Sequence, residues 1–168
     1  MYWAKFSAHI DDNITSEKLK KCHELGIVPY IVLIPFSRFD KNVNVNEILE
    51  GVYDEVFTSI AKEIKKTRFP VYVQFPTKKS LNINNEQFLK MYHYIADQLK
   101  EDGAFNVNWV FEVTDKIESS SSIKKIFPGT DYVDYFLTSN ETEKIIMKNY
   151  PKYKIIKNHT TSFVLKIK

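Results

Sequence analysis

The chain has 168 residues, 43% of them hydrophobic, with a formal net charge of +3. This length is enough for one domain with a real core and too short for two ordinary domains. The Lys and Arg residues are scattered, which argues against a nucleic-acid-binding role. Cys22 is the single cysteine, so an internal disulfide is excluded, and we expect it to be buried in a helix. We expect no metal and no cofactor.

The sequence lacks the long apolar segments that mark membrane or export signals. No apolar run approaches the roughly 20 residues that a membrane-spanning helix needs. Met1 leads directly into a strand-like segment without the apolar region of a signal peptide. As written, the sequence predicts a protein without a membrane partner that is not exported; it would be extracellular if it belonged to a longer precursor.

Short runs rich in Val, Ile, Tyr and Phe alternate along the chain with runs of helical periodicity. Each short run is bounded by Gly, Pro, Asn or Asp, which is typical of β-strands. The predicted strands are Trp3 to Ile10, Val28 to Ile34, Val71 to Phe75, Val107 to Val113, Val133 to Thr138, Tyr153 to Ile156 and Ser162 to Ile167.

The first two predicted helices follow the first two strands. One runs from about Ser16 to Leu25, with Gly26 just past its end, where a left-handed residue commonly stops a helix. The next has apolar residues at i, i+3 and i+4 spacing from Ile48 to Ile64. This pattern predicts one continuous helix of almost five turns.

Two further helices are predicted in the second half of the chain. One has an apolar stripe from Phe88 to Leu99 and ends at Gly103. The other is expected to be capped by Asn140, with Glu143 three residues later. Ser119 to Ser122 is a low-complexity stretch that predicts an exposed loop.

Repeated alternation of apolar strands and helices predicts a parallel sheet covered by helices. The alternation continues across the whole chain, so residues 1–168 are expected to form a single domain. An open doubly wound sheet and a closed barrel both fit this pattern, and periodicity alone does not choose between them.

Three stretches carry motifs in a shared order and spacing. Ile48 to Phe75 has a Gly-x-Tyr-Asp start that leads a helix into a strand. Phe88 to Phe111 has a Gly-Ala-x-Asn-Val turn before a strand with a tryptophan, and Phe127 to Phe136 has a Pro-Gly-x-x-Tyr-Val-Asp entry to a strand. With these motifs, the chain resembles the family 26 glycoside hydrolases, mannanases and related β-glycanases, from about Lys5 to Asn140.

The resemblance implies an α/β fold of the TIM-like (β/α)-barrel type. A full barrel of this kind has about 250 residues, so the resemblance implies a shortened barrel of about seven strands that lacks the first β/α unit. A barrel that lacks a strand must close at a smaller circumference or leave two edges unpaired. Open edges would favour a homo-oligomer.

The resemblance also implies a pair of catalytic glutamates, and neither expected position is acidic. The family's acid/base glutamate follows the fourth barrel strand in a His-Glu-x-Asn element. Here the family's arginine falls on Gln74, its histidine on Thr77 and its acidic residue on Lys78. The nucleophile is expected near the end of the seventh barrel strand. The matching stretch, Tyr153 to Thr161, offers Lys157, Asn158 and His159 but no carboxylate.

Polar residues near other predicted strand ends could line the mouth of the barrel. The candidate catalytic carboxylates are Glu112 and Asp115. The candidate substrate-binding residues are Asp11, Arg38, Gln74, Lys78, Ser139, Asn158 and His159.

Several of these residues also have a purely structural interpretation. We favour a loop and helix-cap role ahead of Ser16 for Asp11 and Asp12 and a solvated loop for Arg38. His159 is interpreted as a core or loop histidine. Trp109 is expected to be a core residue.

Strand alternation links the prediction for Glu112 to its neighbours. Glu112 shares a face with Val110 and Thr114, opposite Trp109 and Phe111. If the Glu112 set faces the barrel interior, the buried carboxylate needs a cation or hydrogen-bond donors. Lys78 or Gln74 could supply them.

Three functions remain open at this point. The leading hypothesis is a degenerate, non-hydrolytic barrel that keeps carbohydrate binding, with an oligo- or polysaccharide as its partner. The second is an active β-glycanase whose carboxylates have relocated to Glu112, Asp115, Asp11 or Asp12. The third is a structural or interaction module that pairs through open strand edges.

Overall fold

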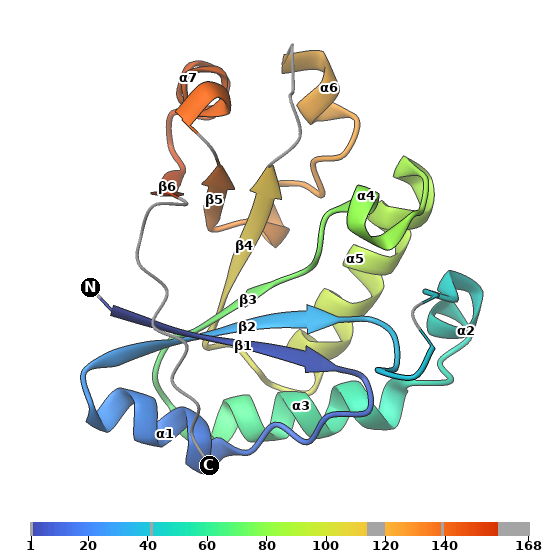
Figure 1. Cartoon of the computed structure of the whole chain (residues 1–168), viewed down its shortest axis with the longest axis vertical. Helices are drawn as coiled ribbons and strands as arrows, with labels where there is room; N and C mark the ends of the chain where they lie inside the picture. The colour runs from blue at the N-terminus through green and yellow to red at the C-terminus, as the bar shows by residue number, and fades with distance from the viewer. Residues whose placement is uncertain (1, 41, 114–119, 139, 158–168) are drawn as a thin grey trace.

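The computed structural model describes residues 2–40, 42–113, 120–138 and 140–157. Every predicted strand within these ranges forms, and together they make one parallel sheet (Figure 1). The strands are β1 (Tyr2–His9), β2 (Ile27–Ile34), β3 (Val71–Gln74), β4 (Val107–Val113), β5 (Tyr135–Thr138) and β6 (Lys154–Lys157). The remaining predicted strand, Ser162 to Ile167, lies outside the described residues.

The strand order distinguishes between the two sheet types that the sequence left open. The order is β1-β2-β3-β4-β5-β6, which is the order of the chain. A doubly wound sheet reverses its order at a switch point, whereas a (β/α) barrel adds each strand beside the last. The sheet is therefore barrel-like, and within the described residues it ends at β1 on one side and at β6 on the other.

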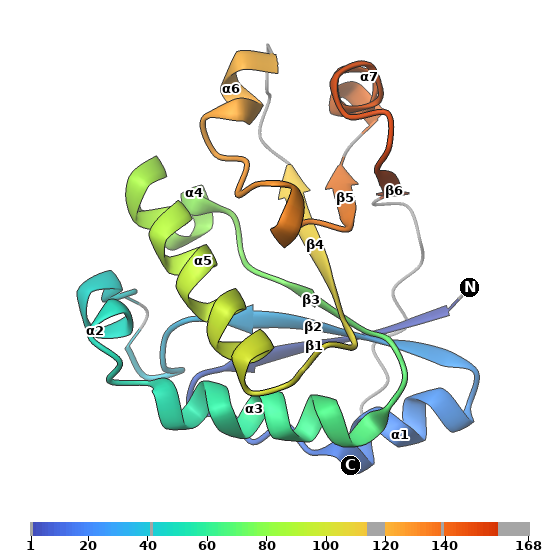
Figure 2. The same cartoon turned by 180° about the vertical axis from the view of Figure 1, so that it is seen from behind.

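The helices cover one face of this sheet. Figure 2 shows α5 in front of the strands, and in both figures α1 and α3 run along the same side of β1 and β2. The larger hydrophobic cluster joins strand and helix residues, whereas the smaller cluster consists of strand residues alone. We call these surfaces the helix face and the inner face.

The helices begin and end close to several of the predicted positions. The first and third predicted helices are confirmed, and the apolar stripe of the third is buried. The helices are α1 (Ser16–Glu24), α2 (Val45–Leu49), α3 (Asp54–Thr67), α4 (Lys78–Leu81), α5 (Asn85–Glu101), α6 (Ser120–Lys124), the 3₁₀ helix η1 (Thr130–Tyr132) and α7 (Asn140–Asn149).

The prediction of one helix from Ile48 to Ile64 is wrong, because two helices, α2 and α3, occupy this region. The chain breaks at Gly51, whose φ is 82° and where an added Cβ would lie 2.8 Å from the Asp54 Oδ2. Only glycine adopts this left-handed backbone without strain. Val52 is exposed and does not continue the buried stripe.

Two smaller predictions also differ from the structure. The serine stretch after residue 119 is not a loop, because Ser120 begins the short helix α6, which the buried side chain of Ile123 anchors. Asn140 is the first residue of α7 and so does not precede it as a cap.

The helix face forms the main core of the molecule. Trp109 and Cys22 are both buried, as predicted. Phe111 is surrounded by other aromatic rings, with centroid separations of 5.8 Å to Phe136 and 6.1 Å to Phe127. Because side chains alternate along a strand, fixing these residues on the helix face turns their neighbours toward the inner face.

Candidate functional site on the inner face

The side chain of Glu112 lies on the inner face of the sheet. Val110 and Leu137 belong to the inner hydrophobic cluster, and Glu112 aligns with Leu137 across β4 and β5. Trp109 and Phe111 lie in the opposite cluster. Glu112 and Val110 therefore face the inner side of the sheet. The Glu112 carboxylate then needs a hydrogen-bond donor or a cation beside it.

Gln74 provides this donor. Its Nε2 donates a hydrogen bond to the Oε2 of Glu112, and its Oε1 accepts one from the Tyr30 hydroxyl at 2.7 Å. Gln74 is 2% exposed and Tyr30 is 5% exposed, while Glu112 is half-buried. Burial raises the pKa of Tyr30 well above its ordinary range, and the negative charge of Glu112 adds to this effect. Tyr30 therefore remains a neutral donor.

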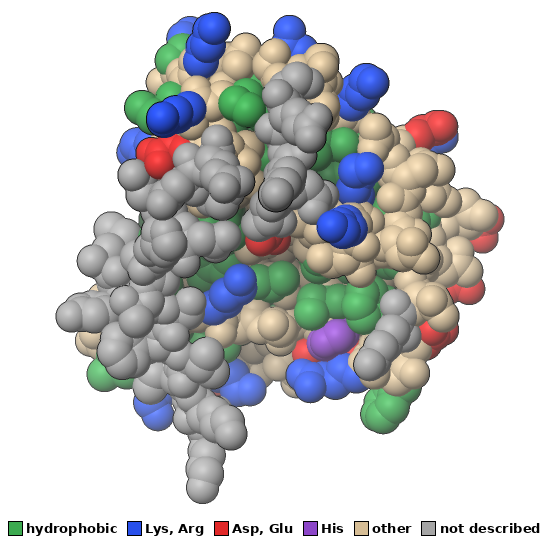
Figure 3. Space-filling model, turned by 45° about the horizontal axis from the view of Figure 1, so that its top comes forward, with side chains coloured by type: hydrophobic (Ala, Val, Ile, Leu, Met, Phe, Trp, Pro, Cys, Tyr) green, Lys and Arg blue, Asp and Glu red, His purple; other side chains and the backbone are tan. Residues whose placement is uncertain are grey.

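Aromatic residues form the rest of the inner face toward the amino ends of the strands. The Trp3 ring contacts Tyr72 and Tyr30 edge-on, with centroids 4.7 Å and 5.7 Å away. The Tyr72 hydroxyl donates to that of Tyr135 at 3.3 Å. Lys154 lies over the Tyr135 ring at 5.9 Å from its centroid. In Figure 3, which views the molecule from the carboxyl ends of β4 and β5, hydrophobic side chains lie in a hollow between basic ones.

The segment after β3 has the structure of a helix start. Thr77, at the position of the family's histidine, caps α4 and accepts a hydrogen bond from the Ser80 N–H. Lys78 is the first residue of α4 and is half-buried. Of the two donors expected for Glu112, the structure shows Gln74 in contact with it. Four other candidates, Asp115, Ser139, Asn158 and His159, lie outside the described residues.

Asp11, Asp12 and Arg38 come together at the carboxyl ends of β1 and β2. The Arg38 Nε and Nη2 donate to the two carboxylate oxygens of Asp12 at 2.6 and 2.8 Å. Asp11 accepts from the Ser37 hydroxyl at 2.8 Å and from the Arg38 N–H. Of the loop and helix-cap role expected for these aspartates, the cap of α1 is wrong, because Thr15 is the N-cap and accepts from the Lys18 N–H.

The contacts of both aspartates favour their ionised form. Partial desolvation opposes ionisation of Asp12, but hydrogen bonds from Arg38 and from the His9 N–H outweigh it and lower the pKa of that carboxyl. Hydrogen bonds from Ser37 and the Arg38 N–H likewise lower the pKa of Asp11 against desolvation. A carboxylate held ionised in this way is a poor general acid.

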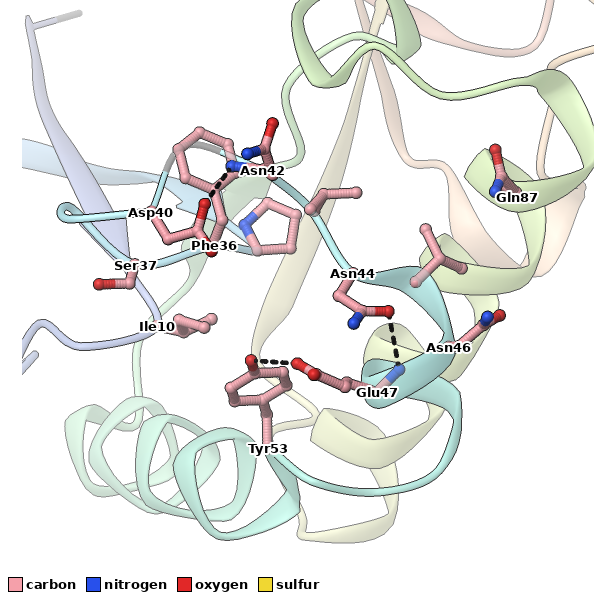
Figure 4. A pocket seen from close by; sticks show the side chains of 13 residues that line it. Ile10, Phe36, Ser37, Asp40, Asn42, Asn44, Asn46, Glu47, Tyr53 and Gln87 are labelled. Carbon is pink, nitrogen blue, oxygen red and sulfur yellow. Dashed lines mark hydrogen bonds between the residues drawn. The ribbon is translucent and has the colours of Figure 1, made fainter.

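A cavity of about 360 Å³ lies beside this cluster, and the sequence analysis did not identify it (Figure 4). It is bounded by the segment after β2, by α2 and Tyr53, and by Gln87 of α5. The sequence signal that could have revealed it is the alternation of Asp40, Asn42, Asn44 and Asn46 with other residues. Polar residues at this spacing also fit a solvated loop, which is the interpretation given above to Arg38 in the same segment.

The described residues contain neither a membrane-crossing helix nor a metal-binding group. No helix among them is both long and apolar enough to span a membrane. Within the same ranges, no three His, Cys, Asp or Glu side chains are grouped so that they could hold a metal ion.

No family model matches the chain. Endoglucanase H of Acetivibrio thermocellus is 28% identical over 105 residues, which cover 55% of this chain and 12% of that protein. The chain thus spans a small part of the curated relative that it matches.

Solved structures of family 26 glycoside hydrolases share the fold. A β-mannanase from Bacteroides ovatus superimposes with a TM-score of 0.70 at 15% identity, covering 91% of this chain and 60% of that one. The family 26 domain of an endo-β-mannanase/endo-β-glucanase from Prevotella bryantii gives 0.67 at 10% identity, covering 95% and 69%. A family 26 protein from Muricauda gives 0.59 at 16% identity, covering 79% and 46%. The predicted resemblance and the α/β barrel-like fold are confirmed.

Proposed function

We propose that this chain is a glycoside-hydrolase-like barrel that binds a carbohydrate on its inner face without hydrolysing it. The observation that carries the proposal is the hydrogen-bond chain from Tyr30 through Gln74 to Glu112. It ties the carboxylate of the inner face to a neutral amide and a neutral phenol. Among the described residues, the two groups that this chain joins to Glu112 are both uncharged.

Hydrolysis of a glycosidic bond ordinarily needs two carboxyl groups roughly 5 to 9.5 Å apart. The position expected for the acid/base group is Lys78, whose positive charge would oppose the oxocarbenium-like transition state. The nucleophile is expected after β6, and the sequence contains no Asp or Glu beyond Glu143. Neither of the two positions expected for the catalytic pair therefore carries a carboxylate.

Binding is supported by the chemistry of the inner face. Sugars are recognised by aromatic rings that pack against their C–H faces and by a few polar groups that bond their hydroxyls. Trp3, Tyr72 and Tyr135 are half-buried on this face, and Glu112 and Gln74 add polar groups. This combination suits a neutral sugar chain.

The proposal is tested by isothermal titration of the protein with β-1,4-linked mannohexaose and cellohexaose. We expect at least one hexaose to bind and no shorter sugars to appear after prolonged incubation. Glu112→Gln should weaken binding about 3- to 10-fold, because it removes a charged acceptor. Phe105→Ala, a change at a 78% exposed ring outside the inner face, is the control.

Two results would contradict the proposal. Release of shorter sugars would favour the active β-glycanase, and Asp11→Asn and Glu112→Gln would then identify its carboxylates. If neither hexaose binds, carbohydrate recognition is wrong, and the interaction-module hypothesis would be tested next by measuring the oligomer mass in solution.

A further inference from the structure

We propose that Phe39 and the adjoining cavity form a distal subsite for a sugar ring of the same β-glycan chain that the inner face binds. This inference rests on the proposed function and names a second part of the binding surface. Phe39 is 96% exposed, the most exposed large hydrophobic side chain among the described residues. In the sequence, Phe39 follows Arg38, whose side chain pairs with Asp12, and precedes Asp40, which lines the cavity.

Hydrogen bonds hold the backbone at Phe39 and the two residues before it. Its N–H donates to the Ser37 hydroxyl oxygen at 3.2 Å, and that hydroxyl donates to Asp11. The preceding residue, Arg38, is bound to Asp12 through two hydrogen bonds. An exposed aromatic ring on an anchored backbone loses less conformational freedom on stacking than one on a free loop. Asp11 and Arg38 would therefore act as positioning residues, because their hydrogen bonds fix the backbone that carries Phe39.

The cavity offers hydrogen-bonding groups suited to sugar hydroxyls. Figure 4 shows Asp40, Asn42, Asn44, Glu47 and Tyr53 around it. Its volume of about 360 Å³ lies in the range of pockets that hold small ligands, roughly 300 to 1,000 Å³. Carboxylates accept from hydroxyls, whereas side-chain amides both donate and accept. This mixture matches a polyol, in which each hydroxyl does both.

Several of these polar groups are already oriented. The Glu47 Oε2 accepts from the Tyr53 hydroxyl at 2.8 Å, and the Asp40 Oδ1 accepts from the Asn42 N–H at 3.1 Å. The Asn44 Oδ1 caps α2 by accepting from the Glu47 N–H, which leaves the amide NH₂ of Asn44 as a donor. Groups held in place before binding lose little freedom when a ligand arrives.

The charge of the cavity favours a neutral ligand over an anion. Its lining includes Asp40 and Glu47, and the described lining residues include no Lys or Arg. An anionic ligand would therefore meet negative charge without a neutralising cation. Phe36, which lines the cavity, accepts a hydrogen bond through its carbonyl oxygen from the Nδ1 of His9, the last residue of β1, at 3.1 Å. Ile34, the last residue of β2, packs against the inner cluster, and Pro35, the next residue, lines the cavity. A sugar chain that continues past the carboxyl end of β2 would therefore meet the cavity.

The test compares Phe39→Ala with Phe105→Ala in titrations with the hexaose that the wild type binds and with the corresponding disaccharide. We expect Phe39→Ala to weaken hexaose binding roughly 5- to 10-fold, the value of one aromatic stacking contact. Disaccharide binding should not change, because a short sugar occupies the inner face alone. Phe105→Ala should change neither. Asp40→Asn should weaken only the hexaose, and Glu112→Gln should weaken both sugars.

The outcomes separate this inference from the proposed function. If the hexaose binds Phe39→Ala as tightly as it binds Phe105→Ala, the distal subsite is wrong and the inner-face proposal stands. If no sugar binds the wild type, both are wrong. Calcium binding that Asp40→Asn abolishes, together with hexaose binding that Phe39→Ala leaves unchanged, would identify a cation site instead.

Discussion

The two faces of strands β3 and β4 differ although they are made by alternate residues of the same segments. On the helix face, Val73 and Phe111 are buried in the main hydrophobic cluster. On the inner face, Gln74 and Glu112 meet in a hydrogen bond, and no helix residue joins the inner cluster. The helix face therefore provides most of the hydrophobic core that stabilises the fold, whereas the inner face carries the polar groups that could act on a ligand.

The largest expected effect comes from the helix face. Phe111→Ala removes a ring that contacts Phe127 and Phe136 and leaves a cavity in the core. We expect the free energy of unfolding in urea, followed by circular dichroism, to fall by about 3 to 5 kcal/mol. Phe105→Ala, at an exposed position, should change it by less than about 0.5 kcal/mol. If both variants lost the same free energy of unfolding, the helix face would not be the main source of stability.

On the inner face, Gln74→Leu should lower the free energy of unfolding by about 2 kcal/mol. The new side chain has a similar size, but it removes the bonding partner of the Tyr30 hydroxyl and a donor to Glu112. In a Tyr30→Phe background the same change should cost less, because no buried hydroxyl is then left unsatisfied. Strict additivity in this double-mutant cycle would show that the hydrogen bond does not couple the two residues.

A smaller effect should appear at high pH. Burial, with the charge of Glu112 acting in the same direction, raises the pKa of Tyr30 above its ordinary value of 10.0. The folded state thus favours the neutral phenol, so this contribution is complete below about pH 10 and is lost as the pH rises above it.

We therefore expect the wild type to lose about 1 kcal/mol more stability per pH unit above about pH 10 than Tyr30→Phe does. Urea titrations across this alkaline range measure the difference. Parallel curves for the two proteins would mean that Tyr30 ionises normally in the folded state.

The smallest effect is expected at the rim of the inner face. The Arg38 side chain is 57% exposed, so its ion pair with Asp12 is well solvated. Arg38→Ala should lower the free energy of unfolding by less than about 1 kcal/mol. The same change should weaken hexaose binding, because it loosens the backbone beside Phe39. A stability loss as large as that of Gln74→Leu would make this cluster part of the structural core.

The sequence predicted the strands well because strand signals are local. Periodicity left two sheet types open, and the barrel-like architecture was expected only from the family resemblance. Alternation along β4 correctly placed Glu112 on the face of Val110, and the need for a donor pointed to Lys78 or Gln74, of which Gln74 is shown to bond it. The break at Gly51 was missed because the apolar periodicity continues across it. Only the packed structure shows that Val52 lies outside the buried stripe.

The candidate site was predicted only in part, because its contacts join distant segments. The ion pair of Asp12 and Arg38 links residues 26 positions apart, and the aspartates had a plausible local role ahead of α1. Thr15 takes that capping role instead. The cavity beside Phe39 depends on α2 and α5 approaching each other, which no pattern within either helix encodes.

The central claim is that the barrel does not hydrolyse glycosides, and turnover of activated aryl β-mannosides and β-glucosides tests it most directly. Wild type, Lys78→Glu and Glu112→Gln should all show no hydrolysis above the uncatalysed rate. Lys78→Glu should not gain activity, because it supplies one carboxylate while the expected nucleophile position remains without one. Robust wild-type turnover that Glu112→Gln abolishes would contradict the account and make Glu112 a catalytic residue.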